Sequence, residues 1–103
     1  MMSKVQQYEN MERLIRSALE VGNTTYPQLL YRKKSLKTNI LRGVVCLIAY
    51  RILLIHPTIA GQMLGRTRQN IINVARKYND YLRAGDELTT ETYFSIIELF
   101  MWL

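Results

Sequence analysis

The segment "PTIAGQMLGRTRQNIINVARKY", residues 57–78, decides the fold that we expect for this chain. Pro57 suits the first turn of a helix, and Gly65 permits a tight turn after that short helix has ended. A longer helix is expected from Thr67 to about Ala84, where Gly85 closes it. Apolar side chains recur at helical spacing in both helices: Ile59, Ala60, Met63 and Leu64 in the first, and Ile71, Val74, Ala75, Tyr78 and Leu82 in the second. Two helices joined in this way predict a helix-turn-helix.

The residues before this segment also follow a helical period. Ser3 and Gln6 fit a capping box, and the apolar stripe that follows them ends at Gly22 and Asn23. A short helical turn is expected at residues 27–30, followed by a basic loop. An almost wholly apolar helix is then expected at about residues 36–55, which is typical of a central buried helix.

The end of the chain predicts one more helix, with Thr89 as its cap. Because no segment alternates with the two-residue period of a strand, we expect an all-α helical bundle. Residues 1–85 would form the helix-turn-helix domain, and residues 86–103 would add an apolar C-terminal helix.

That last helix is apolar on most of its surface and so is expected to be covered. One alternative folds it back onto the apolar side of the first helix. The other pairs it with the same helix of a second chain, giving a homodimer on a palindromic site. The stripe consists of Tyr93, Ile96, Ile97, Phe100 and Met101, widened by Phe94, Leu99, Trp102 and Leu103.

The charge of the chain is unevenly distributed. The net charge is +6, and residues 21–79 contain no Asp or Glu at all. Such a stretch indicates a polyanionic partner, because an ordinary soluble surface mixes both signs. Its positive residues are Arg32, Lys33, Lys34, Lys37, Arg42, Arg51, Arg66, Arg68, Arg76 and Lys77.

The start of the second helix of the motif carries side chains suited to reading DNA bases. Arginine forks onto guanine, and glutamine and asparagine pair with adenine in the major groove. Recognition helices read bases with their N-terminal residues, which is where this cluster lies. The expected base-reading residues are Arg66, Thr67, Arg68, Gln69, Asn70 and Asn73. The expected phosphate or minor-groove contacts are Arg32, Lys33, Lys34, Lys37, Arg42 and Lys77.

Residues 5–82 resemble the C-terminal DNA-binding domain of the bacterial replication initiator DnaA, a helical domain of the Trp-repressor-like kind. The stretches that carry the resemblance are "LLYRKKSLK", "ILRGVVCLIAYRI", "HPTIAG", "GRTRQNI" and "ARKY", in the family's order and with nearly its spacing. By resemblance, Lys34 matches the position that enters the minor groove, and Arg42 matches an arginine that contacts phosphate or base. Arg66 keeps an arginine of the family's pattern.

The chain departs from that family in two respects. The family's Asp-His-Thr-Thr reading cluster is replaced by residues 67–70, so a different target sequence is expected. The nucleotide-binding loop G-x-x-x-x-G-K-[ST] is absent from these residues, so no nucleotide site is expected. A freestanding reader of this kind would regulate replication or transcription, mark a site on a mobile element, or compete with the initiator.

The sequence gives little support for catalysis or for a cofactor. His56 is the only histidine and Cys46 the only cysteine, so neither a zinc set nor a Cys-His pair is expected. Arg51, His56 and Pro57 interrupt the longest apolar run, which predicts no membrane span. The N-terminal residues lack the apolar stretch of a signal peptide, so a cytoplasmic, nucleoid-associated protein is expected. The alternative function is a non-catalytic helical protein-interaction module with a basic face, and gating by a small ligand stays open.

Overall fold

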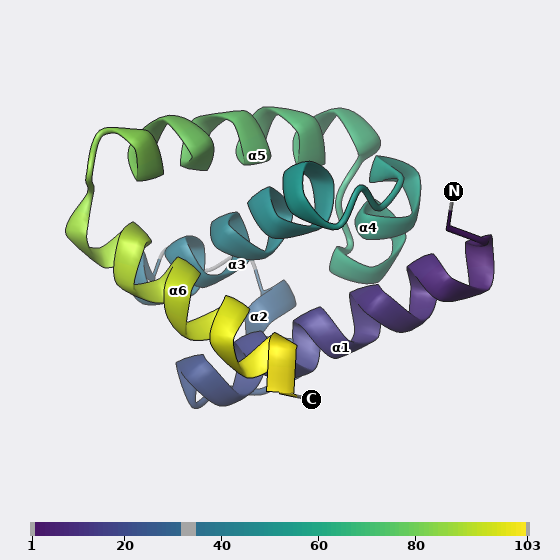
Figure 1. The fold of residues 1–103 in the computed structure, drawn as a ribbon, viewed down its shortest axis with the longest axis horizontal. Helices are drawn as coiled ribbons and strands as arrows, with labels where there is room; N and C mark the ends of the chain where they lie inside the picture. The colour runs from purple at the N-terminus through teal and green to yellow at the C-terminus, as the bar shows by residue number, and fades with distance from the viewer. Residues whose placement is uncertain (1, 32–34, 103) are drawn as a thin grey trace.

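The computed structural model describes residues 2–31 and 35–102, and in these ranges the chain is all-α, with no strand (Figure 1). The helices, in chain order, are α1 (Lys4–Gly22), α2 (Tyr26–Leu30), α3 (Leu36–Leu47), α4 (Pro57–Leu64), α5 (Arg68–Arg83) and α6 (Glu87–Trp102). A short π-helical segment, η1 (Ile48–Ile52), continues α3. The all-α prediction is confirmed.

The first helix begins and ends where the sequence predicts. The Ser3 hydroxyl accepts from the Gln6 N–H at 3.1 Å, and the Gln6 side chain accepts from the Ser3 N–H at 3.0 Å. This reciprocal pair satisfies two donors that a helix start leaves free. At the other end Asn23 adopts the left-handed conformation, with φ of 48°.

The apolar helix α3 lies at the centre of the fold, as predicted, and every residue from Gly43 to Leu47 is buried. Figure 1 shows α5 on one side of it and α1 on the other, and α3 packs on both, as well as on α6. Gly43 permits close packing, because a Cβ there would collide with the ring of Tyr78 from α5.

The end of this central helix differs from the sequence prediction of one helix reaching residue 55. The α-helix changes to π-helix at Ile48, and the helical segment ends at Ile52. Leu54 then has a φ of 56°, which a β-carbon disfavours, and its side chain is 73% exposed. Ile55 is buried again and leads into α4, whose first residue is Pro57, as predicted.

The helices α4 and α5 are joined by a tight turn at residues 65–67. Gly65 has a φ of 65°, and the Arg66 N–H donates to the Gly61 carbonyl at 2.9 Å. A Cβ at Gly61 would lie 2.5 Å from the Arg66 carbonyl oxygen, so the turn passes this helix where only glycine leaves room. At its other end α5 is followed by Gly85, with a φ of 78°, as the predicted closing glycine.

The prediction that Thr89 caps the last helix is wrong. Helix α6 begins at Glu87, and Asp86 supplies the cap. Its carboxylate accepts from the Thr89 N–H at 3.1 Å and from the Thr89 hydroxyl at 2.6 Å, which lowers the pKa of Asp86. Thr89 is therefore a buried residue of the first turn.

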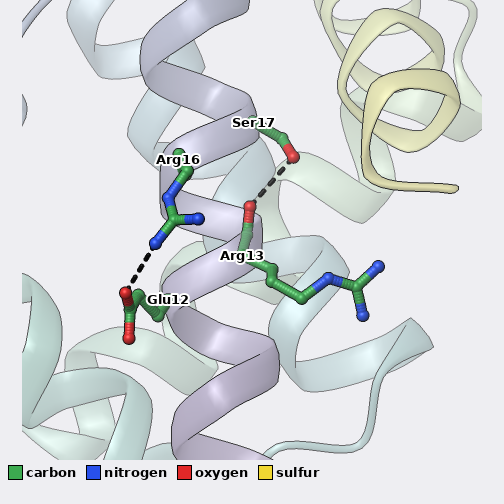
Figure 2. Close-up of polar contacts among 4 residues, drawn as sticks. All are labelled: Glu12, Arg13, Arg16 and Ser17. Carbon is green, nitrogen blue, oxygen red and sulfur yellow. Dashed lines mark hydrogen bonds and ion pairs between the residues drawn. The ribbon is translucent and has the colours of Figure 1, made fainter. Parts of the chain in front are cut away.

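Helix α6 packs within its own chain, mainly against α1 and α3. Ile96 and Phe100 are buried in the core, and Arg13 of α1 contacts the end of α6. The Arg13 guanidinium donates to the Phe100 carbonyl at 3.0 Å and lies 4.4 Å from the Phe100 ring centroid. Figure 2 shows Arg13 projecting from α1, with its own carbonyl accepting from Ser17 and with the Glu12–Arg16 ion pair on a neighbouring face. Pairing of α6 with a second chain stays a prediction.

Candidate nucleic-acid interface

The first turn of α5 presents the polar cluster that the sequence singled out. Thr67 is the N-cap, and its hydroxyl accepts from the Asn70 N–H at 3.1 Å. Immediately after this cap, Arg68, Gln69 and Asn70 are all exposed, and Asn73 is exposed one turn further along. The structure therefore brings four of the six predicted base-reading side chains to the solvent-exposed part of α5.

The buried residues of α5 fix the helix in place. Ile71, Ala75 and Tyr78 are buried, and the helix packs on both α3 and α4. Because the helix packs on two neighbours, the backbone positions that carry its exposed side chains are fixed relative to the rest of the fold.

Two of the exposed amides are linked. The Gln69 side-chain N–H donates to the Asn73 side-chain oxygen at 3.0 Å. This leaves the oxygen of Gln69 and one of its N–H groups open to an adenine edge, which presents one acceptor and one donor in the major groove.

The basic residues divide between the surface and the interior of the fold. Lys37 on α3 and Lys77 on α5 are exposed, and the Lys77 ammonium lies 5.9 Å and 5.8 Å from the rings of Tyr78 and Tyr81. Three predicted contacts, Arg32, Lys33 and Lys34, lie outside the described residues.

Arg42 is half-buried, and its guanidinium binds groups of the protein itself. It donates to the Leu29 carbonyl at 2.6 Å, to the Tyr31 carbonyl at 3.4 Å and to the Asn39 side-chain oxygen at 2.8 Å. The first two acceptors lie at the C-terminal end of α2.

Arg66 is also half-buried, and its guanidinium too binds groups of the protein itself. Its guanidinium donates to the carbonyls of Leu30 at 3.4 Å and of Leu64 and Gly65 at 3.2 Å each. The sequence placed Arg66 among the base-reading residues, whereas the structure sets it between the ends of α2 and α4.

A small cleft of about 190 Å³ lies between α3 and α5. It is lined by Asn39, Arg42, Gly43, Cys46, Asn70, Val74, Lys77 and Tyr78. Burial raises the pKa of the Cys46 thiol to about 12, so this cysteine stays protonated and unreactive. The sequence analysis did not predict Asn39 as a partner of Arg42. Because Asn39 lies three residues before Arg42, about one helical turn away, helical spacing could have indicated this contact.

Within residues 2–31 and 35–102, no group of three His, Cys, Asp or Glu side chains comes together in a way that could hold a metal ion. Nor does any helix in these ranges have the length and apolar character needed to cross a membrane. Comparison of the chain with protein families, with curated proteins and with solved structures finds no match. The resemblance to the initiator domain thus stays a prediction from the sequence.

Proposed function

We propose that this chain is a sequence-specific double-stranded DNA-binding protein in which α4 and α5 form a helix-turn-helix. The observation that carries the proposal is the exposed group Arg68, Gln69, Asn70 and Asn73 at the start of a helix whose Ile71, Ala75 and Tyr78 are buried. These side chains offer the donors and acceptors that major-groove base edges require. The acid-free basic stretch at residues 21–79 supports the same partner.

In this proposal α5 enters the major groove with its N-terminal turn toward the bases. Arg68, an exposed residue, reads a guanine, and the linked amides of Gln69 and Asn73 read an adenine. Lys37 and Lys77 contact phosphates and add affinity that is independent of sequence. The proposal includes no catalytic step, nucleotide or metal.

Selection from a random duplex pool, followed by binding titrations at 50 to 200 mM salt, tests the proposal. The double variant Arg68→Ala/Gln69→Ala should select a different or relaxed motif, because each good bidentate contact discriminates by about 1–3 kcal/mol. Arg83→Ala, an exposed arginine at the far end of the same helix, is the matched control and should keep the motif. An identical motif from the double variant and the wild type would remove α5 from the reading role.

A protein-interaction module is the second candidate, and the surface of α6 favours it. Phe94, Met101 and Trp102 are 60%, 76% and 83% exposed, which is unusual for three large apolar side chains on one helix. A module of this kind should hardly shift duplex DNA at physiological salt, whereas a DNA reader should bind with a steep dependence on salt.

A further inference from the structure

We propose that Arg42 and Arg66 are positioning residues, which together fasten the end of α2 to α3 and to the turn before α5. The expected effect on DNA binding rests on the proposed function, whereas the hydrogen bonds that fasten α2 are a property of the free protein. It gives both arginines a different role from the direct DNA contacts expected from the sequence.

The end of α2 needs such partners. In a helix of five residues, most of the carbonyls accept no hydrogen bond from an N–H of the same helix. Arg42, on α3, donates to the carbonyl of Leu29 in this helix and to that of Tyr31, the residue that follows it. Asn39, one turn earlier on α3, accepts from the other arm of the same guanidinium and holds its orientation.

Arg66 joins the same end of α2 to a second helix end. Both terminal nitrogens of its guanidinium donate to the Leu30 carbonyl, and one also donates to Leu64 and Gly65, where α4 ends. The carbonyls that end a helix carry partial negative charge, so a guanidinium placed between two such ends is stabilised by both. Arg42 donates to the Leu29 carbonyl and Arg66 to the carbonyl of the next residue, Leu30, so the two side chains converge on one region.

The fastening has a direct consequence for the proposed interface. Arg66 lies two residues before Arg68, the first exposed reader of α5, and Tyr31 is the last described residue before the basic segment 32–34. The two arginines thus set the position of the end of α2 relative to the start of α5. Loss of this link should weaken binding to every duplex and should leave the selected motif unchanged.

Replacement by lysine separates this role from a phosphate contact. Lysine keeps the positive charge. If an arginine only contacts phosphate, its replacement by lysine should therefore leave most of the affinity of the protein for DNA. Lysine has one ammonium nitrogen in place of the two terminal nitrogens of the planar fork, so in Arg42→Lys and Arg66→Lys a single donor atom cannot occupy both positions from which the guanidinium donates. Arg76→Lys, at an exposed position of α5, is the matched control.

Amide hydrogen exchange of α2 in the free protein is the first measurement. We expect the protected amides of Leu29 and Tyr31, which donate to Thr25 and Pro27, to exchange about tenfold faster in each variant, as when a hydrogen bond to a charged group is lost. The amides of α1 report whether the whole fold survives. Unchanged exchange at α2 in a folded Arg42→Lys protein would overturn the proposal, even if Arg66→Lys fails to fold.

Duplex binding is the second measurement. We expect each lysine variant to lose about tenfold in affinity, at any sequence, while Arg76→Lys stays near wild type. Full affinity in both folded lysine variants would contradict the positioning role. If the wild type itself does not bind DNA, the proposed function fails, whereas the exchange experiment still decides whether the two arginines fasten α2.

Discussion

At the scale of single residues, Gly43 is the position where the core leaves no space. A Cβ there would collide with the Tyr78 ring, so Gly43→Ala should lower the free energy of unfolding by about 1–3 kcal/mol through overpacking. In a Tyr78→Ala background the same substitution should be neutral or stabilising, because alanine favours a helix over glycine by about 1 kcal/mol. Urea unfolding of the four proteins measures the difference. Equal losses in both backgrounds would rule out the contact as the cause.

The buried Cys46 thiol makes a second residue-scale prediction, on pH. Its pKa of about 12 in the folded chain lies above the ordinary value of about 8.5, so the unfolded chain loses this proton first as the pH rises. The contribution of Cys46 to stability is therefore complete below about pH 8.5 and declines toward pH 12, by at most about 1.4 kcal/mol per pH unit. Urea unfolding between pH 7 and 11 should show a steeper decline for the wild type than for Cys46→Ala. Parallel curves would contradict the burial of a neutral thiol.

At the scale of elements, the end of η1 stores backbone strain. Leu54 has a φ of 56° while its side chain is largely exposed, so glycine there should relieve strain and lose little packing. We expect Leu54→Gly to raise the free energy of unfolding by about 1 kcal/mol. Leu53→Gly is the matched control. Leu53 has a right-handed φ of −85°, so glycine there relieves no strain and should lower the free energy of unfolding of the protein. A loss of stability in Leu54→Gly would mean that the exposed side chain contributes more than the strain costs.

The elements also show what local sequence can and cannot predict. The capping box at Ser3, the first-turn proline of α4 and the glycines after α4 and α5 were predicted correctly, because each acts within a few residues. The start of α6 was predicted wrongly, because Asp86 and Thr89 are both good caps and the pattern does not rank them. The change from α- to π-helix at Ile48 falls inside the apolar stretch at residues 44–50, so periodicity shows no sign of it.

At the scale of the whole molecule, tertiary contacts determine which groups Arg42 and Arg66 bind. The acceptors of Arg42 and Arg66 lie up to 13 and 36 residues away in the chain, so no local pattern shows that these guanidinium groups bind carbonyls. Asn73, by contrast, was placed correctly on the exposed face, because helical spacing alone separates it from Ile71 and Ala75. Sequence periodicity thus predicts which side of a helix a residue occupies, and tertiary structure decides which partner it finds.

At this same scale, α6 has an inner face that completes the core and an outer face that stays apolar. Ile96 is fully buried against the bundle, whereas Phe94, two residues earlier, is 60% exposed. Ile96→Asp should therefore lower the free energy of unfolding by about 3 kcal/mol or more, because it buries an unpaired carboxylate. Phe94→Asp should stay within about 0.5 kcal/mol of the wild type.

Thermal unfolding and light scattering of the two variants separate folding from association. If Ile96→Asp proved as stable as Phe94→Asp, the packing of α6 on its own chain would be wrong. A wild-type mass that rises with concentration, and that Phe94→Asp returns to one chain, would assign the outer face to a second copy. A mass of one chain at every concentration would leave α6 as an intramolecular cover, since its buried side chains Ile96 and Phe100 complete the core of a single chain.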